Sequence, residues 1–179
     1  MRKRYGLVLV LILMALAGRM LPHPENFTPV LAVALFGGAM LSGRLAYVVP
    51  LAAMFLSDLL LGQAFDAMTL VVYGCFLAAV GIGQWLGRHR TWTRTGVAAL
   101  GGSLLFFVVT NFAVWVAPSG APALYPHTFD GLVECYWMAL PFFRNSLAGD
   151  LFWTAMLFGV FDLLHWRRRA EGTVRGGTA

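Results

Sequence analysis

The chain has 179 residues, of which 59% are hydrophobic and only 12% are charged. Its mean hydropathy is +0.73. A soluble domain carries about twice that share of charged residues, and so much apolar side chain cannot be hidden in one core. The net charge of +5 indicates no nucleic-acid partner, because the basic residues fall in short clusters at the ends of apolar runs. The composition therefore excludes a soluble globular protein and predicts a lipid bilayer as the surrounding solvent.

Six apolar segments are long enough to cross a bilayer, which takes about 20 residues, or fewer where a helix is buried in a bundle. Pro50 is expected to kink the third of them. Residues 1–166 then form one transmembrane domain, and the basic segment 167–179 is expected to be a disordered cytoplasmic tail. The six predicted spans cover residues 5–21, 29–43, 45–61, 68–87, 96–117 and 147–166.

The basic residues predict the orientation of these spans. Basic residues near the ends of spans favour the cytoplasmic side of the membrane. On one side of the predicted bundle, the span ends carry only two of them, Arg19 and Arg144, so this side is expected to face outward. The sequence therefore predicts an all-α, six-span transmembrane helix bundle in a bacterial inner membrane, with both termini cytoplasmic. The basic residues at the predicted inner side are Arg2, Lys3, Arg4, Arg44, Arg88, Arg90, Arg94, Arg167, Arg168, Arg169 and Arg175.

A signal peptide is the alternative interpretation of the first span. Residues 1–17 have a basic start, an apolar centre and an Ala-Leu-Ala end before Gly18, which is typical of a cleavage site. Cleavage would leave five spans with an external N-terminus, and the charge asymmetry would still hold.

Three connections face outward in the six-span arrangement: residues 22–28, 62–67 and 118–146. The last contains GLVECYWMALPFF, which is too short and too interrupted to span. We expect it to form an interfacial or re-entrant cap over the bundle. The first is stiffened by prolines within LPHPENFTP and is expected to form a rigid wall or lid of an outward-facing polar cavity.

Polar residues from several predicted spans lie at a similar depth below the outer side, and ionisable groups there usually face the bundle interior or a cavity. Asp58, Asn111, Arg144 and Asp150 are expected to hold polar groups of a ligand. The candidate ligand-binding residues are His23, Asn26, Asp58, Tyr73, Asn111, Tyr125, Trp137, Arg144, Asn145 and Asp150. Among them, Tyr73, Tyr125 and Trp137 are expected to pack against a flat ring.

Internal pairing explains part of the same pattern equally well. Asp58 and Asp150 have two candidate cationic partners, Arg19 and Arg144. In that case the carboxylates serve the fold and contact no ligand. Small residues at Gly37-Gly38-Ala39 and at Gly81 and Gly83 are expected to allow close helix packing.

No catalytic motif is present in the sequence. It contains no HExxH, no phosphate-binding glycine loop and no serine with a histidine base at a recognisable turn. The two cysteines form neither a metal motif nor a disulfide framework. We therefore expect no enzyme, no catalytic residue and no intrinsic cofactor.

Four stretches carry a family resemblance: LPHPENFTPVLAVALFGGA, SDLLLG, FFVVTNFAVW and PFFRNSLAGDLFW. They look like a bacterial family of small membrane proteins whose members mostly lack assigned substrates. Over residues 5–166 the expected architecture resembles the S components of energy-coupling-factor (ECF) vitamin transporters. The resemblance implies a membrane protein that captures a vitamin or related small molecule from outside. Most S components then dock on a shared module of a membrane scaffold and two ATPases.

The nearest parallel among S components is the stand-alone cobalamin transporter type of Gram-negative bacteria. In that type a cysteine in a membrane helix bonds the cobalt, which makes cobalamin the first candidate ligand here. Cys75 would be the cobalt ligand, since its thiolate is a soft donor, and His23 is an alternative axial donor. A cysteine in a span is more often a small packing residue than a ligand, which is the alternative explanation of Cys75.

The sequence departs from the family in one respect. S components that use the shared module commonly carry an AxxxA surface on the first helix, whereas this chain has Ala15 and Arg19 at that spacing. Either coupling uses Ala34 and Gly38 on the next helix, or the protein works without the shared module.

A different functional class is the alternative. The chain could be a non-transporting membrane scaffold, like the small six-span partner of the bacterial cell-shape machinery. That hypothesis predicts that the polar layer is internal ion pairing with no cavity.

Overall fold

A computed structural model describes residues 2–41, 43–117 and 124–176 of the chain. This part contains six α-helices and no strand, as expected for an all-α protein. The helices are α1 (Arg2–Met20), α2 (Val30–Met40), α3 (Leu45–Leu60), α4 (Ala67–Arg88), α5 (Trp92–Val116) and α6 (Phe129–Gly176).

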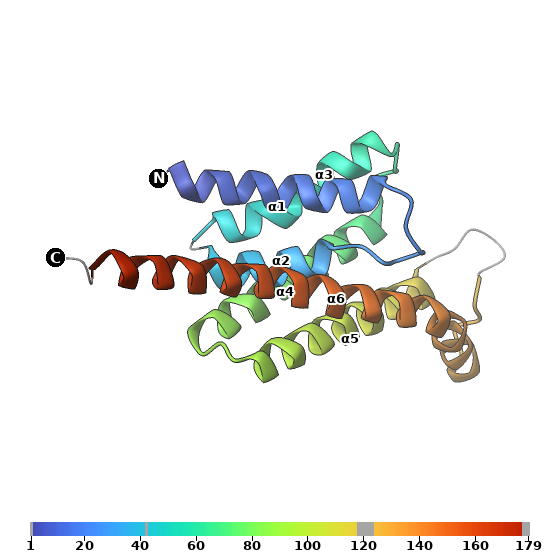
Figure 1. Ribbon diagram of the computed structural model, residues 1–179. Helices are drawn as coiled ribbons and strands as arrows, with labels where there is room; N and C mark the ends of the chain where they lie inside the picture. The colour runs from blue at the N-terminus through green and yellow to red at the C-terminus, as the bar shows by residue number, and fades with distance from the viewer. Residues whose placement is uncertain (1, 42, 118–123, 177–179) are drawn as a thin grey trace.

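Successive helices run in opposite directions along the bundle (Figure 1). The start of α1 and the end of α6 lie at one end, together with the short connections from α2 to α3 and from α4 to α5. The connections from α1 to α2 and from α3 to α4 lie at the opposite end. This alternation agrees with the predicted placement of both chain ends on one side of the bundle.

Helix α2 is the central element and contacts all five other helices. Every residue from Val30 to Gly38 is buried, because the stretch contains no polar side chain. A helix of 11 residues is about 16 Å long, roughly half of the hydrocarbon thickness. The surrounding helices cover α2 from Val30 to Gly38, and its last two residues, Ala39 and Met40, are partly exposed.

Glycines bring α2 and α4 into close contact. A Cβ atom on Gly38 would collide with the backbone oxygen of Val80, and one on Gly83 would collide with that of Leu35. The predicted role of these two residues in close packing is confirmed. The same prediction was wrong for Gly37 and Gly81: a Cβ on Gly37 would meet atoms only at 3.8 Å or beyond, and one on Gly81 would meet nothing within 4 Å.

Large apolar side chains are exposed on α1, α3, α4, α5 and α6. Three helical segments are long and apolar enough to cross a membrane: Ala67–Arg88, Trp92–Val116 and Phe129–Arg167. Apolar helices of 10–17 residues cover Tyr5–Met20, Val30–Met40 and Leu45–Leu60. The length and composition of the helices thus indicate a membrane protein.

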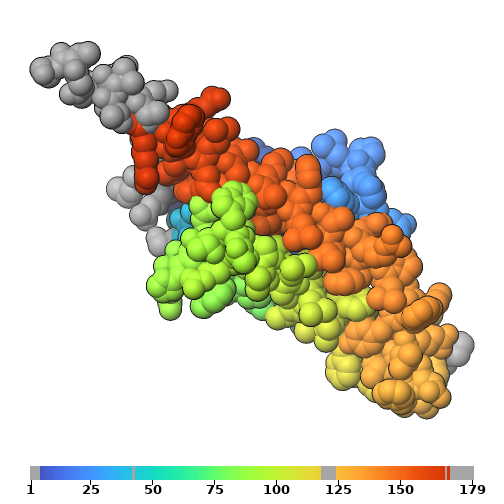
Figure 2. Space-filling view, turned by 60° about the horizontal axis from the view of Figure 1, so that its bottom comes forward, coloured from blue at the N-terminus to red at the C-terminus, as the bar shows by residue number. Residues whose placement is uncertain are grey.

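Helix α6 differs from the prediction at both ends. The sequence placed residues 118–146 in a separate cap, but α6 begins at Phe129; residues 118–123 lie outside the described part. Pro141 lies inside this helix. The first part of α6 turns away from the axis of the longer remainder, and the remainder runs beside α5 (Figures 1 and 2). The expected disordered tail is helical through Gly176, since arginine, alanine and glutamate favour helix; residues 177–179 lie outside the described part.

The first helix contributes directly to the core. Leu11 is 1% exposed, Ala15 is fully buried, and both belong to the main hydrophobic cluster. Helix α1 packs against α3 and α2. Removal of residues 1–17 would take these side chains out of the core.

Candidate ligand-binding site

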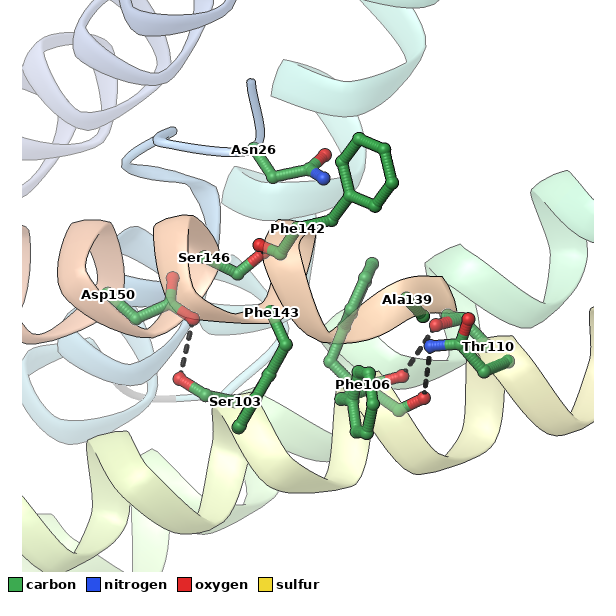
Figure 3. A pocket seen from close by; sticks show the side chains of 11 residues that line it. Asn26, Ser103, Phe106, Thr110, Ala139, Phe142, Phe143, Ser146 and Asp150 are labelled. Atoms are coloured by element: carbon green, nitrogen blue, oxygen red, sulfur yellow. Dashed lines mark hydrogen bonds between the residues drawn. The ribbon is translucent and has the colours of Figure 1, made fainter. Parts of the chain in front are cut away.

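A cavity of about 260 Å³ lies between α5, α6 and the connection that precedes α2 (Figure 3). A smaller one of about 70 Å³ adjoins it, with Asn26, Phe106, Ser146 and Asp150 common to both. The larger cavity is lined by Asn26, Ser103, Phe106, Phe107, Thr110, Asn111, Ala139, Phe142, Phe143, Ser146 and Asp150.

The lining residues of each helix follow helical spacing. On α5 they lie at 103, 106, 107, 110 and 111, and on α6 at 139, 142, 143, 146 and 150. Positions three, four and seven apart share one helix face. Ser103, Ser146 and the phenylalanines were missed from the sequence. The mixture of polar and aromatic residues at this spacing on both segments was the signal that could have found them.

Asp150 is the ionisable residue in the lining of this cavity, and only 7% of it is exposed. Its carboxyl group lies 2.6 Å from the Ser103 hydroxyl, which can donate its one proton either to Asp150 or to the Ala99 carbonyl at 3.0 Å. One turn further along α6, the Thr154 hydroxyl is buried and has no hydrogen-bond partner among the described residues. The predicted pairing of Asp150 with Arg144 was wrong, because residues six apart on a helix lie on different faces.

The polar residues on α5 are partly satisfied by their own helix. The Thr110 hydroxyl donates to the Phe106 carbonyl at 2.7 Å, and the Asn111 amide donates to the Phe107 carbonyl at 2.8 Å. Asn26 reaches the cavity from the α1–α2 connection with a φ of 62°, in the left-handed region that asparagine tolerates. The predicted placement of Asn26, Asn111 and Asp150 around one cavity is thus reproduced.

The first part of α6 packs on the end of α5. The Tyr136 hydroxyl donates to the Val108 carbonyl at 2.7 Å, and the Cys135 thiol lies 3.4 Å from the Asn111 carbonyl. In the preceding turn, the Trp115 indole N–H donates to the Pro126 carbonyl at 3.0 Å. Cys135, which belongs to the segment expected to form the cap, is buried in this contact with 1% exposed.

A second polar cluster lies between α1, α3 and α4, beside a separate cavity of about 230 Å³. The Arg19 guanidinium lies 2.7 Å from the Asp58 carboxylate and donates to the Ser57 hydroxyl at 2.7 Å. The Tyr73 hydroxyl donates to the other Asp58 oxygen at 2.8 Å. The predicted ion pair between Arg19 and Asp58 is confirmed.

The prediction that these polar residues surround one cavity was therefore wrong. Asp58 and Tyr73 belong to the second cluster, whereas Asn111 and Asp150 line the cavity between α5 and α6. Helices α1 and α3 contact neither α5 nor α6 in the described part of the chain, and α2 and α4 lie between them. Depth along a span gives the height of a residue in the membrane but not its direction around the bundle.

Five further candidate residues line neither of these two cavities: His23, Tyr125, Trp137, Arg144 and Asn145. A ring nitrogen of His23 lies 2.6 Å from the Leu21 carbonyl in an exposed turn. Trp137 is 70% exposed and lies in a shallow apolar surface depression with other residues of α6. These side chains lie on the outside of the bundle or in its connections, so the expected packing of Tyr73, Tyr125 and Trp137 around one ring is not formed.

Cys75 is 3% exposed on α4 and also lines neither cavity. Within the described residues there is no group of three or more histidine, cysteine, aspartate or glutamate side chains that could hold a metal ion. The position of Cys75 corresponds to the packing role considered from the sequence.

The fold and site define an all-helical membrane protein with a small polar and aromatic cavity towards one end of its bundle. Residues 1–172 match the family of unknown function DUF6580, and the chain belongs to that family. No curated protein and no solved structure matches the chain.

Proposed function

We propose that the protein is a six-span inner-membrane protein that captures a small molecule from outside the cell for uptake, in the manner of an S component. The cavity between α5 and α6 carries this proposal. It combines a buried carboxylate, amides, hydroxyls and phenylalanine rings, which is the mixed lining typical of small-molecule sites.

The position of the cavity supports capture from the outer side. It is walled by Asn26 from the α1–α2 connection, which lies at the end of the bundle opposite to the start of α1. The basic clusters at the other end favour a cytoplasmic location for that end. The shorter apolar helices α1, α2 and α3 complete six spans if the bilayer adapts to their length. Leu11 and Ala15 belong to the core, which favours retention of residues 1–17 over cleavage of a signal peptide.

The geometry does not favour cobalamin as the ligand. A corrinoid is larger than the drug-sized molecules that fill cavities of about 300–1,000 Å³, and the cavity has about 260 Å³. Cys75 is buried on α4, outside its lining, and His23 lies in an exposed turn. The proposal therefore keeps uptake of a small molecule and assigns no cobalt ligand.

Of the two alternatives for energy coupling, function without the shared ECF module is better supported than docking through Ala34 and Gly38. Ala34 and Gly38 were one possible docking surface, but both are buried, and Gly38 lies against the backbone of α4. A partner module could not reach them without separating α2 from α4.

A membrane scaffold is less well supported. That hypothesis predicted internal ion pairing without a cavity. The described residues contain two such pairs, Arg19 with Asp58 and Arg90 with Asp162, but they also enclose a cavity. The cavity beside Asp150 is the observation that favours a binding protein. No step of the proposal requires catalysis.

The test is the identification of small molecules that co-purify with the protein from bacterial membranes, by mass spectrometry. Ala139→Phe puts a ring into the cavity, whereas the matched Ala155→Phe puts one on an exposed position of the same helix. We expect wild type and Ala155→Phe to release the same compound and Ala139→Phe to release at least tenfold less. Release of no compound above the blank, or equal release from all three proteins, would contradict the proposal.

Topology is tested separately. Reporter fusions at Gly43 and at His89 should be active only as cytoplasmic reporters, and a fusion at Gln63 only as an external one. Intact mass should include residues 1–17. A mature chain that begins at Gly18 would replace six spans by five.

A further inference from the structure

The Asp150 carboxylate has no cation beside it in the described part of the chain. Its single recorded hydrogen bond comes from Ser103, and the lining of its cavity includes no lysine, arginine or histidine. A carboxyl group that loses water is compensated by a cation, by several hydrogen bonds or by taking up a proton, most of all within a membrane. A cation that enters the cavity would favour the ionised form, and Asp150 would then be half of an ion pair.

Aromatic rings from both helices line the same cavity as this carboxyl group. Phe106 and Phe107 come from α5 and Phe142 and Phe143 from α6, and Figure 3 shows Phe143 directed from α6 towards α5. The rings of Phe107 and Phe143 lie with their centroids 4.5 Å apart. Phenylalanine faces carry negative partial charge and attract both flat rings and cations.

The size of the cavity limits the ligand further. At about 260 Å³ it lies just below the range of about 300–1,000 Å³ that drug-sized ligands occupy. Asn26, Thr110 and Asn111 add amide and hydroxyl groups at its edge, which suits one ring with a few polar substituents.

We propose that the ligand of this cavity is a small aromatic cation, a single flat ring with a protonated nitrogen that pairs with Asp150. The inference rests on the proposed function and names its ligand class. A neutral ring leaves the carboxylate uncompensated, and a carboxylate ligand adds repulsion between like charges. The phenylalanine rings hold the flat part of the ligand and contribute attraction for its charge.

The test compares three probes that share one ring and differ in charge: benzylamine, benzyl alcohol and benzoate. Binding to the purified full-length protein in phosphatidylcholine nanodiscs is measured at pH 7 by calorimetry at millimolar probe concentrations. We expect benzylamine to bind wild type at least tenfold more tightly than benzyl alcohol, and benzoate to bind more weakly than either. Asp150→Asn, which keeps an acceptor for Ser103, should reduce the preference for benzylamine to less than twofold.

Two further variants keep the test informative if Asp150→Asn folds poorly. Asp130→Asn removes an exposed carboxylate from the same helix outside the cavity, and should bind all probes as wild type does. Ala139→Phe should bind none of them.

Equal binding of the three probes, no binding of any, or an unchanged preference in Asp150→Asn would overturn the inference. A neutral or anionic compound that co-purifies with wild type and is lost in Ala139→Phe would also overturn it, but would leave the proposed function intact. Absence of any co-purified compound would instead count against the proposed function.

Discussion

Asp58 and Asp150 are both buried aspartates in helices of one bundle, but their surroundings differ. Asp58 receives a guanidinium from α1 and a phenol from α4, whereas Asp150 receives one serine hydroxyl from α5. The pair at Asp58 joins three helices and leaves little charge for a ligand. The lone carboxylate at Asp150 faces a cavity with aromatic walls. We infer that the first aspartate stabilises the fold and that the second is available for function.

The largest effect is expected at the paired aspartate. Arg19→Ala leaves the Asp58 carboxylate buried without its cation, and breaking a buried pair in this way costs about 3–5 kcal/mol of unfolding free energy. Chemical unfolding in one defined detergent measures it. Arg144→Ala is the control, because Arg144 is exposed and has no recorded partner in the described residues, and it should change stability by less than about 0.5 kcal/mol. Similar losses for both arginines would contradict the structural role of the pair.

The second effect concerns the helices that separate the two aspartates. Gly83→Ala places a methyl group against the Leu35 backbone oxygen, so α2 and α4 must move apart. Overpacking of this kind costs about 1–3 kcal/mol. Gly81→Ala is the matched control on the same helix and should be neutral or stabilising, because its Cβ meets nothing within 4 Å and alanine favours helix. Thermal unfolding measures the melting temperatures of the two variants. A Gly83→Ala protein that melts higher than Gly81→Ala would refute the prediction.

The comparison becomes sharper when each aspartate is made neutral. Asp150→Asn removes a carboxyl group without a cationic partner and keeps an acceptor for Ser103. The unfolding free energy should therefore change by less than about 1 kcal/mol, and any change should be an increase in stability. Asp58→Asn should destabilise, since it leaves the partly buried Arg19 guanidinium without its anion. Both variants are measured by the same chemical unfolding. A loss at Asp150 as large as that at Asp58 would show that both carboxylates serve the fold.

The smallest effect is expected at Asp66, which is exposed beside the Asp58 cavity and caps α4. The backbone N–H and the hydroxyl of Thr69 donate to its carboxylate and lower its pKa below 3.8. A carboxyl with a lowered pKa in the folded state adds stability above its unfolded pKa and loses it as pH falls through the folded value. Asp66→Ala should therefore melt slightly earlier than wild type at pH 7, with the difference fading as pH falls below 3.8.

Melting curves across this pH range check the prediction for Asp66. Glu25→Ala is the control, because Glu25 is an exposed loop carboxylate with no recorded hydrogen bond in the described part of the chain. It should melt like wild type throughout. A pH-independent difference at Asp66 would indicate that the charge and its hydrogen bonds are not responsible.

The sequence by itself determined the helical class and most helix bounds. Five of the predicted segments, such as 45–61 against Leu45–Leu60, end within a few residues of the observed helices. Apolar runs bounded by glycine, proline and charge define a helix locally, so neighbours along the chain contain the information. The exception is α6, where Pro141 indicated an interruption in the sequence but only bends a helix that begins at Phe129.

Only the tertiary structure decided how the polar residues group. The sequence gives the depth of Asp58, Asn111 and Asp150 in their spans, and depth suggested one layer. The direction of each side chain around the bundle depends on which helices are neighbours, and α2 and α4 separate α3 from α5 and α6. The pair of Arg19 and Asp58 could be predicted from opposite charge at matching depth. The partner of Asp150 could not, because Ser103 carries no charge and reaches it only through the packing of α5 on α6.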